Sequence, residues 1–338
     1  MGMVALCLHS GDALAGNCKL ARLAEWPVRV VQGHLFVDGE INGRKVAIML
    51  DTGASTTLLL RPAAERLGLT LRPVRNLRMF GVGGETNVDT TQIDEFRVGD
   101  AVRQNWRIYV SGNRDFGADM LLGEDFFRAV DVEFDLAHDM VRLFQAKDCD
   151  GVSLAYWANE RVGEVELDPI ENARPQIVVP VRINGEALRA LFDSGANMSV
   201  VEKAEAARLG VTPDSPGVST SGKGLGLGRL AVDTWVGNFK SFAIGNETIR
   251  DVDLRFAPFL KDVVYTETGS NVPTKVSTSS SMLLGLDFIR AHRVLIAHSQ
   301  NRLYFTHNGG PVFSEKQRLA PPGNPVVDER AMPPAGTR

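Results

Sequence analysis

The sequence predicts a mostly β protein with two barrel-like lobes that are related by internal duplication. Two observations lead to this prediction: short sequence blocks recur in the same order in both halves, and the segments around them have strand-like lengths and patterns. The length of 338 residues fits two domains. We expect a leader or signal remnant at 1–29, a first lobe at 30–147, a linker at 148–174, a second lobe at 175–307 and a disordered tail at 308–338.

The internal repeat consists of four matched blocks. Three keep an offset of 142 positions, and the fourth has an offset of 162. The blocks are Ile41-Asn42-Gly43 with Ile183-Asn184-Gly185, Asp51-Thr52-Gly53-Ala54 with Asp193-Ser194-Gly195-Ala196, Ala64–Gly68 with Ala206–Gly210, and Leu121-Leu122-Gly123 with Leu283-Leu284-Gly285. The second copy therefore holds 20 additional residues, which we assign to about Lys261–Ser281 because that stretch has the Ser, Thr and Gly content of a mobile loop.

Each copy begins with a predicted β-hairpin. In the first copy, residues 35–41 and 45–50 are short apolar runs joined by Asn42-Gly43. Asn-Gly between two such runs is a strong signal for a two-residue hairpin turn. Residues 177–183 and 188–192 repeat this pattern in the second copy.

Short helices are predicted after each Asp-containing block. Residues 61–67 and 201–209 have helical patterns, and a glycine follows each at Gly68 and Gly210, as is common at helix C-termini. Second short helices are expected to start near Asp125 and Asp287, and further strands are expected at residues 106–110 and, bridging the lobes, at 162–167.

The composition excludes several functional classes. The net charge is −4, and the chain has no long basic run that would favour nucleic acid or an anionic membrane surface. It contains no apolar stretch of membrane-spanning length. The six histidines lack the H-E-x-x-H spacing of zinc proteases, and no G-x-S-x-G nucleophile motif occurs. We interpret His138 and His298 as surface turn residues, and we expect no metal and no cofactor.

The cysteines and the N-terminus bear on the cellular compartment. A short apolar run at Met3–Leu8 and the small residues at Ala13–Ala15 fit a signal remnant, although a leader without function is the alternative. Cleavage after Ala15 would leave Cys18 and Cys149, on either side of the first lobe. These cysteines are either a disulfide pair that ties the ends of this lobe or two unrelated thiols. The compartment that we expect is periplasmic or secreted.

The duplicated Asp blocks carry the predicted chemistry. Asp51 and Asp193 each follow an apolar strand, which would hold the two carboxylates rigidly and partly away from water. Two carboxylates that share one proton can supply a general base and a general acid for hydrolysis. In the same loops Thr52 and Ser194 can bond to the backbone of the other copy, and Gly53 and Gly195 permit a sharp turn and a close approach.

On these motifs, residues 30–147 and 175–307 each resemble retropepsin-like aspartic proteases, and the two-domain, single-chain arrangement is similar to bacterial, often periplasmic members. The resemblance implies a pepsin-like bilobal fold with the active site between the lobes. It also implies an aspartic endopeptidase that activates water between Asp51 and Asp193. Glycine-rich flaps would close over an extended peptide at Gly81, Gly83 and Gly84 in the first copy and at Gly224 and Gly226 in the second. Ordinary loops are the alternative for these glycines.

The chain departs from the family pattern beside each aspartate. Ser55 and Asn197 follow the alanines where relatives often carry Asp or a hydroxyl residue, which bears on subsite polarity. Ala54 and Ala196 stand where pepsin-like enzymes have a hydroxyl residue. Without that hydrogen-bond donor the carboxyl pKa values should be higher, so we predict maximal activity at mildly acidic pH.

Two other functions remain compatible with the sequence. One is a peptide-binding module that keeps the fold and lacks activity, and the other is a zymogen whose N-terminal segment or insertion fills the cleft. We expect a peptide or protein substrate, no nucleic acid, no membrane span and a monomer, because both aspartates lie in one chain.

Overall fold

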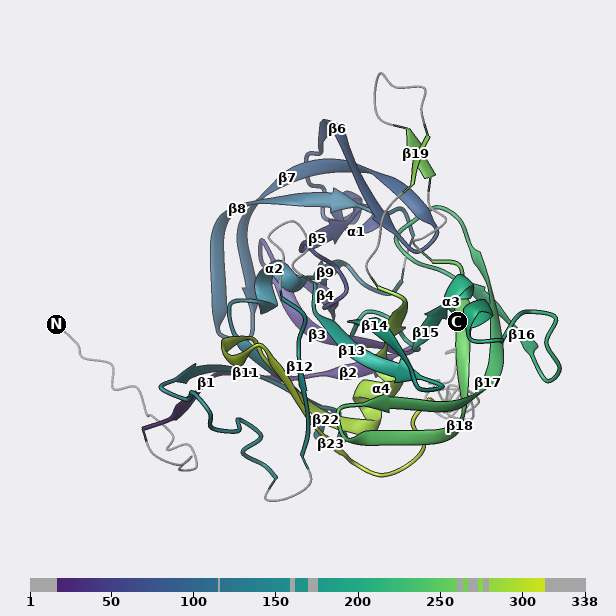
Figure 1. Ribbon diagram of the computed structural model, residues 1–338. Coiled ribbons are helices and arrows are strands. Elements are labelled where there is room, and N and C mark those ends of the chain that lie inside the picture. Colours follow the sequence, from purple (N-terminus) through teal and green to yellow (C-terminus); the bar gives the residue numbers. More distant parts are fainter. Residues whose placement is uncertain are drawn as a thin grey trace, which may run out of the picture.

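The computed structural model describes residues 17–114, 116–158, 162–169, 176–259, 264–266, 273–275 and 280–313. The predicted signal remnant, Cys7 and most of the predicted insertion lie outside these residues. The prediction of a mostly β protein with two barrel-like lobes related by duplication is confirmed (Figure 1). We call the N-terminal half lobe 1 and the C-terminal half lobe 2.

Lobe 1 is built on a curved sheet in the order β2-β3-β4-β9-β5-β8-β7-β6, in which β3 also pairs with β7. Its helical turns are α1 (Arg61–Arg66), α2 (Glu124–Phe127) and η1 (Leu136–His138). Its strands are β2 (Arg29–Val31), β3 (His34–Ile41), β4 (Arg44–Leu50), β5 (Leu58–Leu60), β6 (Arg72–Gly81), β7 (Gly84–Val98), β8 (Ala101–Ser111) and β9 (Met120–Leu122).

Lobe 2 repeats this topology in the order β13-β14-β21-β15-β18-β17-β16, with a further pairing of β13 with β17. Its helical turns are α3 (Lys203–Arg208), α4 (Leu286–Ala291) and η2 (His298–Gln300). Its strands are β13 (Val178–Ile183), β14 (Glu186–Phe192), β15 (Val200–Glu202), β16 (Ser219–Gly224), β17 (Val232–Ile244), β18 (Glu247–Ala257) and β21 (Met282–Leu284); β19 (Val264–Thr266) and β20 (Pro273–Lys275) pair separately.

A third sheet, the interlobe sheet, joins the two halves and lies in the lower left part of the view in Figure 1. Its order is β1-β11-β10-β22-β23-β12, so that lobe 1 supplies β1, β11 and β10, lobe 2 supplies β22 and β23, and the segment between the lobes supplies β12. Its strands are β1 (Lys19–Pro27), β10 (Asp131–Asp135), β11 (Met140–Lys147), β12 (Gly163–Glu166), β22 (His292–Ala297) and β23 (Arg302–His307).

The duplication appears in this sheet as a two-fold axis. Strands β10 and β22 pair in antiparallel orientation, and Glu133 lies directly opposite Leu295. These two residues are also equivalent in the repeat, because Leu295 follows Glu133 by the 162 positions that relate the C-terminal parts of the copies. The approximate two-fold axis of the molecule therefore passes between Glu133 and Leu295.

The turn residues explain why both hairpins form where they were predicted. Asn42 and Gly43 have φ values of 49° and 72°, and Asn184 and Gly185 repeat this conformation at 54° and 84°. Positive φ at both turn positions matches the right-handed twist of the flanking strands, and Asn and Gly adopt it most easily. Both predicted hairpins are therefore present as β3–β4 and β13–β14.

Three boundaries differ from the predicted ones. Residues 19–27, which we assigned to the leader, form β1 and pair with β11, since Trp26 is buried in the core. Phe313, which we assigned to the disordered tail, is 4% exposed and packs edge-on against Phe242 with ring centroids 4.9 Å apart. Helix α3 starts at Lys203 because the preceding residues form β15.

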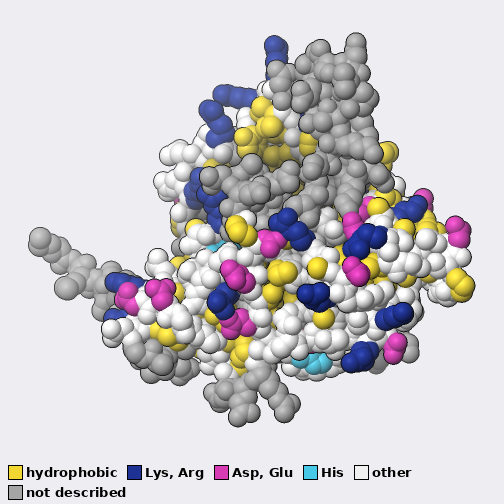
Figure 2. Space-filling model, in the orientation of Figure 1, with side chains coloured by type: hydrophobic (Ala, Val, Ile, Leu, Met, Phe, Trp, Pro, Cys, Tyr) yellow, Lys and Arg dark blue, Asp and Glu magenta, His cyan; other side chains and the backbone are white. Residues whose placement is uncertain are grey.

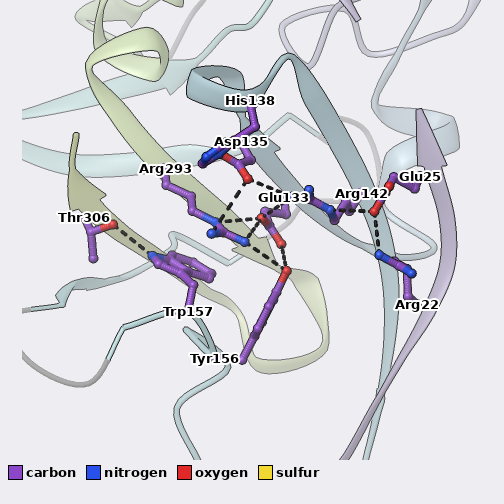
Figure 3. A network of polar contacts seen from close by, with 10 residues as sticks. All are labelled: Arg22, Glu25, Glu133, Asp135, His138, Arg142, Tyr156, Trp157, Arg293 and Thr306. Atoms are coloured by element: carbon purple, nitrogen blue, oxygen red, sulfur yellow. Dashed lines mark hydrogen bonds and ion pairs between the residues drawn. The ribbon is translucent and has the colours of Figure 1, made fainter. Parts of the chain in front are cut away.

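Covalent and polar contacts fasten the interlobe sheet. Cys18 and Cys149 form a disulfide, which ties the start of β1 to the end of β11. Next to the two-fold axis, Glu133 is fully buried and accepts hydrogen bonds from Arg142 of lobe 1, from Arg293 of lobe 2 and from the Tyr156 hydroxyl (Figure 3). A carboxylate shared by both lobes fixes how the lobes meet.

The surface of the described residues carries charges of both signs. Basic and acidic side chains are interspersed over the lower part of the face in Figure 2. Among the described residues, no helix is long and apolar enough to cross a membrane.

Candidate active site

The two aspartates lie at equivalent ends of equivalent strands. Asp51 follows β4 and Asp193 follows β14, and each of these strands runs parallel to a short Leu-Leu strand of its lobe, β9 or β21. The amide of Asp51 donates to Leu122 O at 2.9 Å, and the amide of Asp193 donates to Leu284 O at the same distance. The buried, apolar ends of these strands therefore hold both aspartates rigidly.

The hydroxyl residues of the two loops bond across the lobe interface. Thr52 Oγ1 donates to Phe192 O at 2.8 Å and accepts from the amide of Ser194 at 3.0 Å. Ser194 Oγ donates to Leu50 O at 2.8 Å and accepts from the amide of Thr52 at 3.1 Å. Both side chains are fully buried, so these four bonds are shielded from water and fix the loops relative to each other.

The glycines of the loops allow the aspartates to approach each other. A Cβ atom on Gly53 would overlap the carboxyl group of Asp193, and one on Gly195 would overlap that of Asp51. Each glycine backbone therefore lies against the carboxyl group of the opposite lobe. Any side chain at either position would separate the two carboxyl groups or displace the loops.

The carboxyl groups of Asp51 and Asp193 are hydrogen-bonded to each other. Ala54 N donates to Asp51 Oδ1 at 3.0 Å, while Gly195 N and Ala196 N donate to Asp193 Oδ1 at 2.9 and 3.0 Å. Both residues keep some accessible surface but are densely surrounded by protein. Burial raises the pKa of both carboxyl groups, and the charge of Asp193 raises the pKa of Asp51 further, well above its ordinary value.

Hydroxyl–carboxylate pairs support each Asp loop from below. Asp125 Oδ1 accepts from Thr57 Oγ1 at 2.6 Å, and Asp287 Oδ1 accepts from Ser199 Oγ at 2.6 Å. These hydroxyls in turn accept from the amides of the Leu-Leu-Gly glycines, Gly123 at 3.0 Å and Gly285 at 2.9 Å. The start of each short helix is thereby attached to its Asp loop.

The predicted flap glycines lie in two hairpins whose ends meet. Gly81 and Gly84 flank the β6–β7 turn, and the chain from Gly224 to Val232 joins β16 to β17. Gly228 N donates to Val82 O at 3.0 Å, and Leu230 N donates to Gly83 O at 2.8 Å.

Apolar side chains cross between the lobes at these ends. Leu227 of lobe 2 packs on a lobe 1 cluster that includes Leu60 and Phe116. Val82 of lobe 1 packs on a lobe 2 cluster that includes Leu191 and Phe259.

Sequence reasoning missed several residues near the site. Nδ1 of His34 lies 3.1 Å from the carbonyl oxygen of Gly195, and its ring contacts Phe116. Burial lowers the pKa of His34. His298 was predicted to lie at the surface but has only 5% of its side chain exposed and faces Glu124, so that prediction is wrong; His138 is 70% exposed, as expected for a surface turn. The repeat itself held a signal, since Glu124 stands at the position of Leu286 in the other copy.

The fold and the site define a two-lobed protein with one pair of buried, interacting aspartates at the lobe interface. Residues 37–129 match the family of gag-polyprotein putative aspartyl proteases, and residues 179–288 match an aspartyl protease family. Together the two matches cover more than half of the chain and contain both Asp loops. The chain therefore contains two aspartyl protease family domains, one in each lobe.

Three individual proteins are similar to parts of the chain. The UBA domain-containing protein Mud1 of Schizosaccharomyces pombe is 36% identical over 111 residues, which are 32% of each protein, so the chain spans about a third of this curated relative. A retropepsin-like aspartic protease from Rickettsia conorii is 22% identical with a TM-score of 0.29, covering 38% of this chain and 95% of that one. An aspartic proteinase from Irpex lacteus is 10% identical with a TM-score of 0.47, covering 84% and 97%.

Proposed function

We propose that this protein is an aspartic endopeptidase whose catalytic residues are Asp51 and Asp193. The observation that carries this proposal is the pair of hydrogen-bonded carboxyl groups, held between lobes by the reciprocal bonds of Thr52 and Ser194. Membership of an aspartyl protease family supports the same reaction class.

The chemistry follows from two carboxyl groups that hold one proton. The ionised carboxylate takes a proton from a bound water molecule while the water oxygen bonds to the peptide carbonyl carbon. The protonated carboxyl gives its proton to the carbonyl oxygen, which yields a tetrahedral diol. The carboxyl that took the proton from water then gives a proton to the peptide nitrogen, the C–N bond breaks, and the other carboxylate takes a proton from the diol, which leaves a carboxylic acid and an amine. The two carboxyl groups titrate as a unit, so the shared proton belongs to the pair rather than to one aspartate.

The pH dependence follows from the environment of the pair. Burial and mutual repulsion raise the carboxyl pKa values, and no hydroxyl stands at Ala54 or Ala196 to favour the charged form. The singly protonated pair should therefore persist to higher pH than in a site rich in donors. We expect maximal cleavage at mildly acidic pH, and a maximum in strong acid would contradict this expectation.

The hairpin ends would act as flaps in this proposal. In this proposal the two ends separate when an extended peptide binds, which breaks the Val82–Gly228 and Gly83–Leu230 backbone bonds and the apolar contacts between the ends. Because both aspartates belong to one chain, we propose that the monomer is active. The Cys18–Cys149 disulfide supports an oxidising compartment, periplasmic or extracellular.

Cleavage of a mixed peptide library at several pH values tests the proposal. We expect the wild-type protein to cut internal peptide bonds, and Asp51→Asn and Asp193→Asn each to lower the rate by about 10²–10⁴-fold or more, because each removes one of the two proton-transfer groups. Asp125→Asn is a matched control, because it changes a carboxylate that supports the loop without joining the pair. It should lose far less activity.

Two other outcomes would replace the proposal. Peptide binding without turnover at any pH would indicate a binding module of the same fold. Turnover that starts only after limited proteolysis would indicate a zymogen.

A further inference from the structure

A buried acid and a buried base face each other where lobe 1 meets the interlobe sheet. Glu124, the first residue of α2, is fully buried, and His298, the first residue of η2, has 5% of its side chain exposed. Nε2 of His298 lies 3.2 Å from Oε1 of Glu124. Among the described residues, neither carboxyl oxygen and neither ring nitrogen has a hydrogen-bond partner of good geometry. Each side chain is therefore the main polar partner of the other.

The equivalent place on the other side of the two-fold axis is apolar. Offset by 162 positions, Glu124 corresponds to Leu286 and His298 corresponds to Leu136. Leu286 is fully buried, Leu136 packs against the same core, and α4 lies against η1. Two leucines form this contact in the other half of the molecule, so the fold does not require a polar pair here.

The pair is attached directly to the loop of Asp51. The amide of Glu124 donates to Ala54 O at 2.8 Å, and Gly123 packs beneath Ala54–Thr57. On the other side, His298 belongs to the turn that follows β22 of lobe 2. A change of charge in the pair consequently acts between the Asp51 loop and the opposite lobe.

We propose that Glu124 and His298 are positioning residues that hold the Asp51 loop against lobe 2 through one shared proton, and that a second proton on the pair releases this hold in acid. With one proton the pair is neutral overall, either as carboxylic acid and imidazole or as carboxylate and imidazolium. With two protons it carries a net positive charge in a buried site, and such a charge is costly. The protonated histidine should then move toward solvent and weaken the contact.

The charged groups around Glu124 and His298 are compatible with this uptake of protons. Asp125 and Arg128 lie close enough to Glu124 to act on it with opposite signs, and Asp131 accepts hydrogen bonds from the His298 and Ser299 amides and from the Ser299 hydroxyl. Burial raises the pKa of Glu124 to about 9 and lowers the pKa of His298 to about 4. The pair is therefore neutral overall between these values, and the second proton arrives near pH 4.

The sign of the stability effect follows from the pKa values of both groups. In the unfolded chain His298 takes up its proton near pH 6.5 and Glu124 near pH 4.5, whereas in the folded protein they do so near pH 4 and pH 9. Between pH 4.5 and 6.5 the folded and the unfolded pair each hold one proton, so the pair does not change the stability there. Stability is lost as the pH rises from 6.5 toward 9, where only the folded pair holds a proton, and over a narrow range as the pH falls from 4.5 to 4.

The decisive variant copies the other half of the molecule. Glu124→Leu combined with His298→Leu installs the natural Leu286–Leu136 arrangement. We expect the thermal midpoint of the wild type to fall between pH 6.5 and 9 with a slope that the double variant lacks. If the double variant fails to fold, Glu124→Gln keeps the size of the side chain and takes up no proton, and it should show the same flattening. His138→Gln is the matched control, because it changes the 70%-exposed histidine of the equivalent turn and should leave the slope unchanged.

A kinetic readout rests on the proposed peptidase function. With the peptide that the wild type cuts best, the acid limb of the pH–rate profile should move about one unit lower in the double variant, a tenfold gain in relative rate on that limb. Equal unfolding slopes in the wild type and both variants would overturn the proposal whether or not the protein cleaves peptides. Unequal slopes without any cleavage would support the pair and count against the peptidase.

Discussion

The two lobes match closely around the aspartates and differ in the interlobe sheet that joins them. The loops at Asp51 and Asp193 share their strand ends, their cross-lobe bonds and their supporting hydroxyl–carboxylate pairs. On the interlobe sheet, lobe 1 presents Glu133 where lobe 2 presents Leu295. The difference teaches that both halves must supply the same parts to the site, whereas the layer that joins them is free to diverge.

The contrast between charged residues in lobe 1 and apolar residues in lobe 2 continues at neighbouring positions of the interlobe sheet. Glu133, Asp135 and Arg142 form the charged network of Figure 3, and their equivalents in the repeat are Leu295, Ala297 and Tyr304. These three belong to an apolar cluster that also contains the Cys18–Cys149 disulfide and Leu154. At these three positions lobe 1 therefore uses charged contacts and lobe 2 uses apolar packing, whereas the disulfide of the apolar cluster joins β1 to β11, which both belong to lobe 1.

We expect the largest change in stability from a substitution that makes the two residues at the two-fold axis alike. Glu133→Leu copies Leu295 and removes the carboxylate that accepts from Arg142, Arg293 and Tyr156. Because the loss leaves buried cations short of a partner, the free energy of unfolding should fall by about 3–5 kcal/mol. Urea unfolding at pH 7 measures this change. Glu133→Gln, which keeps the volume, separates charge from packing, and a loss below about 1 kcal/mol for Glu133→Leu would show that Asp135 suffices for both arginines.

The next prediction tests whether the Asp51 and Asp193 loops contribute equally to stability, as their matching geometry predicts. Thr52→Ala and Ser194→Ala each remove one donor and one acceptor from a fully buried set of bonds. Each should cost about 2–4 kcal/mol of unfolding free energy, with the two values close to each other. The double variant should cost less than the sum, because each hydroxyl bonds to the other residue's amide. Clearly unequal single losses would break the equivalence, and Ser55→Ala in the same loop serves as the control.

A smaller effect, this time a gain in stability, concerns the charges of Asp51 and Asp193. The folded pKa values of Asp51 and Asp193 lie above their unfolded values, so the folded state holds protons that the unfolded chain releases, and stability is lost as the pH rises through the folded values. Asp51→Asn or Asp193→Asn should therefore raise the thermal midpoint at pH 7 by about 2–4 °C, and less at pH 4. Differential scanning calorimetry at both pH values checks this, and a lower midpoint at pH 7 would contradict the assigned direction.

The smallest effect compares the two hairpin ends. Val82 and Leu227 each pack on the opposite lobe, while Leu230 is 69% exposed. Val82→Ala or Leu227→Ala should speed hydrogen exchange of the Gly228 and Leu230 amides about tenfold, because truncation of a partly buried side chain costs roughly 1–2 kcal/mol. Leu230→Ala should change exchange little. If it matches the other two, the backbone bonds rather than the crossed side chains hold the ends together.

The sequence predicted the features that depend on local residues or on the repeat. Asn42-Gly43 specifies its hairpin through positive φ, and Gly68 ends its helix for the same reason. The matched Asp loops predicted a pair of lobes, since one copy alone would leave a single carboxylate. The strand at residues 163–166 also lies where the alternating pattern indicated it.

The remaining features depend on contacts that no local pattern encodes. His34 reaches Gly195 O, and Arg293 reaches Glu133, only because the lobes pack together. Trp26 and Phe313 fell in the segments that we assigned to the leader and to the tail, yet both side chains are buried in the core. A residue-by-residue comparison of the two copies would have marked Glu124 and Glu133 as polar substitutions at apolar positions.

The register at the two-fold axis also bears on how such a molecule can assemble. In a dimer of identical chains, the residue on the axis faces its own copy, so every substitution there appears twice. Glu133 in that setting would oppose a second glutamate, with two buried carboxylates and their repulsion at the centre of the interface. Joining the halves in one polypeptide removes this constraint, and it allows a single carboxylate opposite Leu295 to draw one arginine from each lobe.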